Sequence, residues 1–169
     1  PWNCLWNPYP RKSLTLIIGV TGDTHNNLKN IKKICSIFNK NRVDYVFHTG
    51  DVSLPKSLLA FKALKCPLKV ILGNNDIEEA QDLIKVSKKW DCKIFHEPFT
   101  INLAGKRICI VHHPELISDE LLKNNDLILH GHTHRFRKEI INNTLIFNPG
   151  ECAGFMKNKN QVGVVDLKT

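Results

Sequence analysis

The sequence contains no apolar stretch that approaches the roughly 20 residues needed by a membrane-spanning helix. It also lacks internal repeats, low-complexity tracts and linker-like segments, so its 169 residues are expected to form one domain with a buried core. These absences disfavour a helical membrane protein, a repeat array and a chain of separate modules.

The first 13 residues lack the apolar core of a secretory signal, although they include two Trp and three Pro. We expect residues 1–13 to be an N-terminal tail, either the remnant of an added or trimmed leader or a segment docked on the surface. Residues 14–169 then form the single folded domain.

Closely spaced cysteine pairs of the CxxC type are also absent, which disfavours a zinc knuckle or a disulfide framework. The six cysteines are scattered, at Cys4, Cys35, Cys66, Cys92, Cys109 and Cys152. Cys35 and Cys109 fall on apolar faces, where a free thiol behaves as a small hydrophobe. We therefore expect reduced cysteines and a cytoplasmic location.

Acidic residues are in deficit, with 16 Asp and Glu against 24 Lys and Arg, which gives a formal net charge of +8. This charge favours nucleic-acid binding, but many lysines fall on the solvent sides of predicted helices. These are Lys29, Lys32, Lys33, Lys40, Lys85, Lys88 and Lys89. A solvated face is therefore the default, and its field would still attract an anionic phosphate ester. Arg135 and Arg137, beside a histidine motif, are placed for direct phosphate contact.

Continuous apolar runs predict strands that are covered on both faces of a sheet. The runs span residues 14–20, 43–47, 68–72, 108–111 and 127–129. Helical spacing of apolar residues predicts helices at 28–38, at 58–64 with Pro55 in the first turn, and at 77–88 with Asp76 as N-cap. The alternation of strands and helices implies parallel strands with right-handed crossovers.

From about Cys92 the pattern changes to short alternating runs, with hairpins expected around residues 104–106 and 142–143. A helix is predicted from Glu115 to Lys123, and the last strand from Gln161 to Leu167. The expected fold class is therefore α/β, with two sheets packed face to face and helices outside.

Short polar motifs follow the apolar runs. They are Gly22-Asp23-Thr24-His25, Gly50-Asp51, Gly73-Asn74-Asn75-Asp76, His112-His113 and His130-Gly131-His132-Thr133-His134. In an open α/β sheet, ligands bind beyond the carboxyl ends of the strands, so these side chains should meet at one edge. Carboxylate, amide and imidazole groups suit Mn²⁺, Zn²⁺ or Fe²⁺. The set predicts a two-metal site.

Together the motifs resemble those of the calcineurin-like metallophosphoesterase superfamily, in particular its compact branch of small bacterial and archaeal phosphodiesterases. The resemblance covers residues 14–167 and includes the turn Asn148-Pro149-Gly150. It implies a four-layer α/β/β/α sandwich of two mixed sheets, with a di-metal centre between the sheet edges.

The resemblance also implies two divalent cations, with Mn²⁺ as the leading candidate and Zn²⁺, Fe²⁺ or Ni²⁺ as alternatives. The implied ligands are Asp23, His25 and His134 for the first ion, Asn74, His112 and His132 for the second, and Asp51 as the bridge. A shared carboxylate can hold two cations about 3.5–4 Å apart, and a water activated between them would attack phosphorus in line with the leaving group.

Simpler interpretations exist for single residues. Asp23, Asp51 and Asn74 could serve only as turn residues. His132 and His134 could be core or surface histidines, although on an extended strand they would point the same way, as a chelating pair should.

The remaining candidates have open roles. The family usually has His-Gly-His at this position, whereas this chain has His112-His113-Pro114. His113 could hold a metal ligand in place, face the phosphate, or be an exposed residue without a role in the site. His48 and His130 are expected to orient ligands or to pack under the site. His96 is expected on the surface, and the role of Glu151 is open.

Asn75 departs from the family pattern, in which many members have a His that protonates the leaving oxygen. An amide can hydrogen-bond a phosphoryl oxygen but cannot act as a general acid near neutral pH. Because general acid catalysis contributes about 10²–10⁴-fold, His113 or a metal-bound water would have to replace it. Asn75 and His113 are thus the candidate catalytic residues.

The resulting hypothesis is a metal-dependent phosphoesterase that hydrolyses phosphodiesters of small molecules. Three alternatives stay open: a phosphomonoesterase, including a protein phosphatase; a scaffold like the retromer subunit that shares this fold; and a nuclease, favoured by charge alone.

Overall fold

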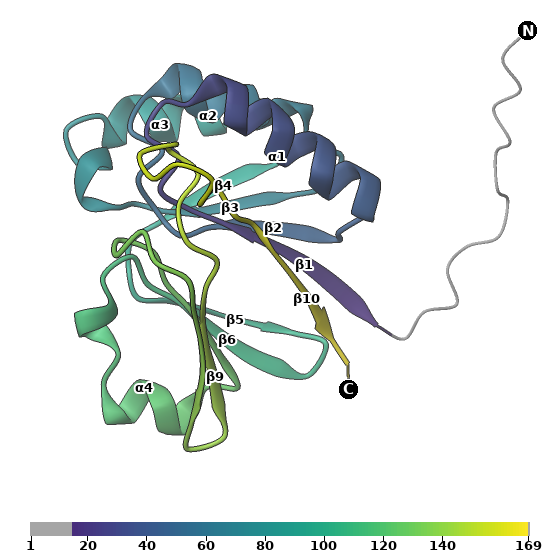
Figure 1. Ribbon diagram of the computed structural model, residues 1–169, viewed down its shortest axis with the longest axis vertical. Coiled ribbons are helices and arrows are strands. Elements are labelled where there is room, and N and C mark those ends of the chain that lie inside the picture. The colour runs from purple at the N-terminus through teal and green to yellow at the C-terminus, as the bar shows by residue number, and fades with distance from the viewer. Residues whose placement is uncertain (1–14, 169) are drawn as a thin grey trace, which may run out of the picture.

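The computed structural model describes residues 15–168, and the expected tail of residues 1–13 lies outside the described residues. Two five-stranded sheets pack face to face, with α1–α3 on the outer side of the first sheet and α4 on the outer side of the second (Figure 1). The expected four-layer α/β/β/α sandwich of two mixed sheets is confirmed.

The first sheet has the strand order β10-β1-β2-β3-β4. Its strands are β1 (Leu16–Thr21), β2 (Tyr45–His48), β3 (Leu68–Ile71), β4 (Cys92–Phe95) and β10 (Gly163–Leu167). Strands β1 to β4 are parallel, as the alternation of strands and helices predicted, and β10 joins β1 antiparallel. The carboxyl ends of β1, β2 and β3 therefore meet at one edge.

Three helices cover this sheet: α1 (Leu28–Asn41), α2 (Pro55–Ala60) and α3 (Ala80–Ser87). Helix α1 begins where the Asn27 side chain accepts a hydrogen bond from the Asn30 N–H (3.1 Å), and its buried face consists of Ile31, Ile34, Cys35 and Phe38. Pro55 opens α2, as expected. All seven lysines assigned to the solvent sides of helices are exposed.

Helix α3 is shorter than the predicted helix 77–88, and Asp76 is not its N-cap. A short 3₁₀ turn, Asn74–Asp76, precedes it. The buried Asp76 carboxylate instead accepts backbone N–H groups from Asp51 (2.8 Å), Ser53 (2.6 Å) and Gly73 (2.8 Å). It ties together the loops that follow β2 and β3.

The second sheet has the order β5-β6-β7-β9-β8. Its strands are β5 (Phe99–Leu103), β6 (Lys106–Ile110), β7 (Leu127–Leu129), β8 (Arg137–Ile141) and β9 (Thr144–Asn148). Both expected hairpins are present, and their turn residues have positive φ: 49° and 73° at Ala104 and Gly105, 50° and 67° at Asn142 and Asn143.

Helix α4 (Asp119–Asn124) begins later than the predicted start at Glu115. The Ser118 hydroxyl accepts a hydrogen bond from the Leu121 N–H (3.3 Å) and so fixes the first turn. Residues Pro114–Leu116 form a separate 3₁₀ turn.

The apolar layer between the sheets holds the sandwich together. Phe47 and Ile71 of the first sheet and Ile108, Ile110 and Leu129 of the second are completely or almost completely buried in one cluster. Each such side chain contributes about 1.5–3 kcal/mol by leaving water. This layer fixes the distance between the two sheet edges that carry the polar motifs.

Four of the cysteines within the described part are buried and free, and Cys66, also free, is partly buried. Burial raises the pKa of the Cys35 thiol to about 11 and that of Cys92 to about 12, as expected of unreactive structural thiols. Within residues 15–168, every helix is too short or too polar to cross a membrane.

Candidate metal centre

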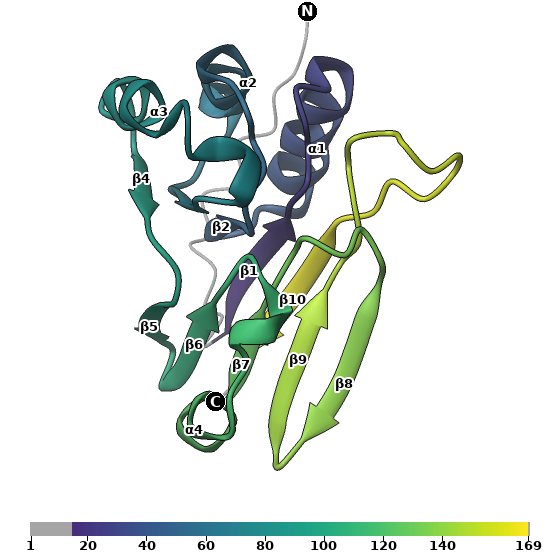
Figure 2. The same cartoon turned by 90° about the vertical axis from the view of Figure 1, so that its left-hand side faces the viewer.

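The polar motifs of both sheets meet at one end of the sandwich. Asp23 and His25 follow β1, Asp51 follows β2 and Asn74 follows β3, whereas the second sheet supplies His112 after β6 and His132 and His134 after β7. Figure 2 shows the loop between β7 and β8 and the loop between β9 and β10 at the upper end of the second sheet. All seven predicted ligands are thus brought together.

One group consists of Asp23, His25 and His134, whose ligand atoms lie within 4.8 Å of one another. The Nε2 atoms of His25 and His134 are 3.2 Å apart, and His134 Nε2 lies 3.5 Å from Asp23 Oδ1. These are the three residues expected around the first ion.

A second group consists of Asn74, His112 and His132. Asn74 Oδ1 lies 2.9 Å from His112 Nε2 and 3.1 Å from His132 Nδ1, and the two ring nitrogens are 3.3 Å apart. These are the three residues expected around the second ion.

Asp51 lies between the two groups. Its Oδ2 atom is 3.4 Å from His25 Nε2 in the first group and 3.6 Å from His112 Nε2 in the second. One carboxylate therefore faces both groups, which is the geometry a bridging ligand requires.

The protonation of His112 shows that the second group fits a cation. His112 Nδ1 lies 2.8 Å from the Thr49 carbonyl, which can only accept, so this nitrogen carries the proton. Burial lowers the pKa of His112, so its ring is neutral and Nε2 presents a lone pair. That lone pair faces the Asn74 side-chain oxygen at 2.9 Å. Both atoms are acceptors and cannot hydrogen-bond to each other, whereas a cation between them could bind both.

The carboxylates point to the same conclusion. Asp23 is fully buried, and burial, with the charge of Asp51 second, raises its pKa to about 8. Burial also raises the pKa of Asp51, but His112, two hydrogen bonds from Asn75 and His25 together leave it below its ordinary value. The ion pairs that both carboxylates form are with histidines, and no lysine or arginine in the described part pairs with them. Because no lysine or arginine within residues 15–168 neutralises these buried carboxylates, binding of a metal ion there is favoured.

Five of the predicted ligands have left-handed backbone conformations. Their φ values are 47° at Asp23, 38° at His25, 62° at Asp51, 67° at His132 and 57° at His134. Such conformations are uncommon outside glycine and cluster at functional sites. His132 and His134 would point the same way only on an extended strand, but β7 ends at Leu129 and both residues have positive φ, and their side chains lie in different groups.

Two glycines allow the loops to approach each other closely. A Cβ atom on Gly73 would lie 2.3 Å from Asp51 Oδ1, and one on Gly50 would lie 2.4 Å from His112 Nδ1. Both positions must therefore lack a side chain for Asp51 and His112 to occupy their places.

Asn75 holds the Asp51 carboxylate at both oxygens. Its backbone N–H donates to Oδ1 (2.9 Å) and its side-chain amide donates to Oδ2 (2.8 Å). Asn75 thus orients the residue that lies between the two groups.

Glu97 was not found by sequence reasoning, yet it organises His113. Its Oε1 lies 2.6 Å from His113 Nδ1, and its Oε2 accepts the backbone N–H groups of His112 (2.5 Å) and His113 (3.0 Å). The His113 ring lies 4.6 Å from the His132 ring. Glu97 stands alone before Pro98, outside any motif, so only its contacts reveal it.

The other histidines lie where sequence reasoning placed them. His48 is buried below the site, with Nε2 3.1 Å from the Thr24 hydroxyl, and burial lowers its pKa to about 3. His130 is buried as well, whereas His96 is exposed.

Glu151, whose role was open, is completely buried behind the first group. Its carboxylate accepts the N–H groups of Phe155 (3.3 Å) and Met156 (2.8 Å) and lies 3.8 Å from His134 Nδ1. Of the two arginines expected near phosphate, Arg137 is held in an ion pair with Glu139 (2.6 Å), and Arg135 lies next to His134 in a cavity.

Comparisons with known proteins find similarity over nearly the whole chain. The model of the calcineurin-like phosphoesterase superfamily domain matches residues 16–169. Phosphodiesterase MJ0936 of Methanocaldococcus jannaschii is 29% identical over 159 residues, which cover 89% of this chain and 93% of that protein.

Solved structures share the fold. An archaeal phosphodiesterase superposes with a TM-score of 0.79 at 28% identity, covering 90% of this chain and 94% of the other. The Escherichia coli phosphoesterase Yfce (0.71, 20% identity, 90% and 89% covered) and Chaetomium thermophilum Vps29 (0.70, 16% identity, 92% and 83% covered) have the same fold.

Proposed function

Because the chain belongs to the calcineurin-like phosphoesterase superfamily, we propose that it is a metal-dependent hydrolase of phosphodiesters. The observation that carries this proposal is the position of Asp51, whose Oδ2 faces ligand groups on both sides at 3.4 and 3.6 Å. The similarity to an archaeal phosphodiesterase over nearly the whole chain supports the choice of diesters.

The proposal assigns Asp23, His25 and His134 to the first cation and Asn74, His112 and His132 to the second, with Asp51 shared. Mn²⁺ is the proposed ion, with Zn²⁺, Fe²⁺ and Ni²⁺ as alternatives of similar ligand preference. When bound, the two ions would bind phosphoryl oxygens and lower the pKa of the attacking water.

The residues of the chain itself supply orientation and a proton. Asn75 holds Asp51 through two hydrogen bonds and presents an amide at the edge of the site. His113 Nδ1 is held by Glu97, so its Nε2 is the ring atom left to donate a proton to the departing oxygen. A carboxylate that binds one imidazole nitrogen fixes the orientation of the ring.

The ligand set also distinguishes an enzyme from a scaffold. Vps29 shares the fold at 16% identity, which bears on fold alone. This chain brings the seven expected ligands together, and a scaffold has no need of two buried carboxylates that face clustered histidines. The free buried cysteines support the proposed cytoplasmic location.

The test is an Mn²⁺-supplemented assay across bis-aryl, nucleotide and lipid-headgroup diesters, with monoesters and DNA in parallel. We expect turnover of diesters, two Mn²⁺ per chain by metal analysis, and loss of both properties in Asp51→Asn with the circular dichroism spectrum unchanged. Asp82→Asn, an exposed change on α3, is the control. Monoesters cleaved faster than every diester, or near wild-type turnover by Asp51→Asn, would contradict the proposal.

A further inference from the structure

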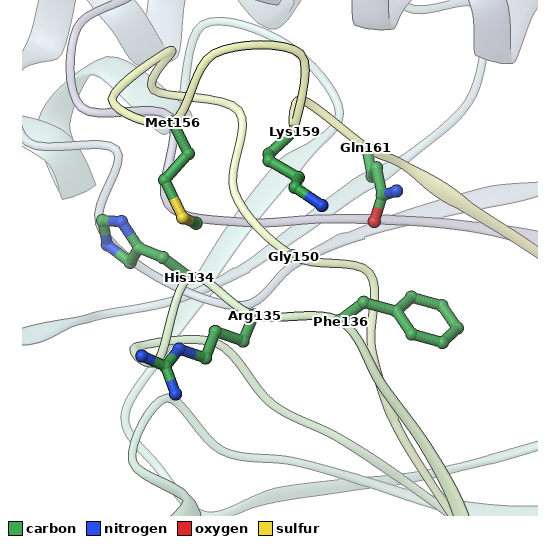
Figure 3. Close-up of a pocket in the computed structure, with 7 residues that line it drawn as sticks. All are labelled: His134, Arg135, Phe136, Gly150, Met156, Lys159 and Gln161. Atoms are coloured by element: carbon green, nitrogen blue, oxygen red, sulfur yellow. The ribbon is translucent and has the colours of Figure 1, made fainter.

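A cavity of about 310 Å³ opens directly beside the candidate metal centre, and His134 lines it (Figure 3). The other lining residues are Arg135, Phe136, Gly150, Met156, Lys159 and Gln161. They come from the loop between β7 and β8 and from the loop between β9 and β10. The volume is at the small end of the range of about 300–1,000 Å³ for ligand pockets, so the cavity suits a single ring system with its sugar.

The walls of the cavity suit a flat aromatic group. Phe136 is 60% exposed and stands edge-on to Phe147, with ring centres 6.1 Å apart. In Figure 3 the Met156 side chain reaches toward His134, and the Gln161 amide points toward the space over Gly150. An aromatic face and a thioether pack against a planar ring, and an amide can both donate to and accept from its edge.

The lining is also positively charged. Arg135 and Lys159 contribute two cations, and the lining residues include no Asp or Glu. Neither cation forms an ion pair with another residue of the described range 15–168. Figure 3 shows the Lys159 ammonium directed toward the space over Gly150. An unpaired lysine in this position favours a ligand with a negative charge in addition to the reacting phosphate.

The loop that carries Met156, Lys159 and Gln161 has a fixed shape. The Gln161 N–H donates to the Glu151 carbonyl (3.1 Å) and closes the base of the loop. The buried Glu151 carboxylate accepts the Met156 N–H (2.8 Å), and the Asn30 side chain donates to the Cys152 carbonyl (2.8 Å). A cavity formed before the ligand arrives loses less ordering entropy on binding.

We propose that this cavity binds the ester substituent that stays on phosphorus when the leaving group departs, and that it selects a nucleoside bearing a further phosphate. The base packs against the exposed Phe136 ring with Gln161 at its edge, Met156 lines the side of the cavity next to His134, and Lys159 binds the additional phosphate. This proposal rests on the proposed function, because His134 places the cavity next to the phosphate that reacts.

Three substrates with the same leaving group test the selection: the p-nitrophenyl phosphodiesters of methanol, of thymidine (at its 5′ oxygen) and of thymidine 3′-phosphate. Because p-nitrophenolate leaves in each case, differences in kcat/KM report the other substituent. We expect kcat/KM to rise about tenfold from methyl to thymidine, the order of magnitude of one base–aromatic stack, and to rise again with the 3′-phosphate.

Two variants with matched controls assign the effect to the cavity. Phe136→Ala should lose about tenfold on both thymidine esters and nothing on the methyl ester. Lys159→Gln should lose activity only on the 3′-phosphorylated ester. Ile140→Ala on β8, the strand that follows Phe136, and Lys157→Gln on the loop of Lys159 change exposed residues outside the cavity and should match the wild type.

Binding of thymidine 3′,5′-bisphosphate, measured by calorimetry with Mn²⁺ present, separates this proposal from the proposed hydrolysis. Tight binding that weakens in Phe136→Ala and in Lys159→Gln supports the cavity, even if no ester turns over and the hydrolase proposal fails. Equal kcat/KM for the three esters, or bisphosphate binding unchanged in both variants, would overturn the cavity and leave the hydrolase standing.

Discussion

Asp23→Asn should stabilise the metal-free protein at neutral pH and destabilise the Mn²⁺-loaded protein. Burial, with the charge of Asp51, raises the pKa of Asp23 from 3.8 to about 8 in the absence of cations. Asparagine has nearly the same shape and keeps an oxygen that can accept the His132 N–H, which lies 3.1–3.2 Å from the Asp23 carboxylate. The substitution removes a negative charge that destabilises the metal-free fold and that the bound cation requires.

The magnitude follows from proton linkage. In the unfolded chain the carboxyl ionises near pH 4, whereas in the metal-free fold it keeps its proton up to about pH 8. The folded state binds more protons across this window, so the free energy of unfolding falls as pH rises from about 4 to about 8. At 1.36 kcal/mol per pKa unit, this loss is about 4 kcal/mol by pH 7.

Buried histidines change stability in the opposite direction. Burial lowers the pKa of His25, His48 and His112, so their contribution to stability increases as pH rises toward about 6.5. These contributions cancel in the difference between the unfolding free energies of the variant and the wild type, because both proteins contain the same histidines.

Urea unfolding in EDTA at pH 5 and pH 7.5, and again in Mn²⁺, provides the measurement. In EDTA the advantage of Asp23→Asn should grow by about 3 kcal/mol between the two pH values, and in Mn²⁺ the order should reverse. Asp82→Asn should follow the wild type throughout. An equal pH dependence in Asp23→Asn and wild type would refute the reasoning, since it would mean that Asp23 holds no excess proton in the fold.

Three further predictions concern the groups around Asp51 and the proton donor. Asn75→His should raise turnover of alkyl diesters and leave aryl diesters nearly unchanged, because a second proton donor beside His113 helps most when the leaving oxygen is basic; a series of alkyl and substituted phenyl esters measures this, and an equal change on all of them would refute it. Glu97→Gln should slow alkyl diesters about 10²-fold and p-nitrophenyl diesters less, since it weakens the orientation of His113; equal losses on both would argue against a proton-transfer role. Gly73→Ala should lower activity about 10²-fold and weaken Mn²⁺ binding in calorimetry, because its Cβ would lie 2.3 Å from Asp51 Oδ1; full activity would contradict the close packing.

Strands, hairpins and the meeting of the motifs were predictable because they depend on local pattern and on one rule of sheet topology. The run 127–129 became β7 without change, and Asn142-Asn143 formed the expected turn. The assignment of His132 and His134 to different ions came from the family resemblance, whereas their geometry could not be predicted, because positive φ at both residues replaces the regular alternation of a strand.

Contacts between distant segments account for what sequence reasoning missed. Glu97 reaches His113 across 16 positions and lies outside any motif. Asp76 lies in a motif, but its contact with the Asp51 N–H, 25 positions away, leaves no periodic signal. The cavity beside His134 likewise depends on two loops whose proximity follows only from the folded sheets.

Because the ligands come from both sheets, the affinity of the centre for cations depends on how stably the two sheets pack against each other. Neither sheet alone carries both groups, since the first supplies Asp23, His25, Asp51 and Asn74 and the second supplies His112, His132 and His134. Cation affinity therefore contains the free energy of docking the two sheets. A substitution such as Phe47→Leu, buried in the interlayer core and not itself a ligand, should weaken metal binding through loosened docking, and bound cations should slow hydrogen exchange at this interface.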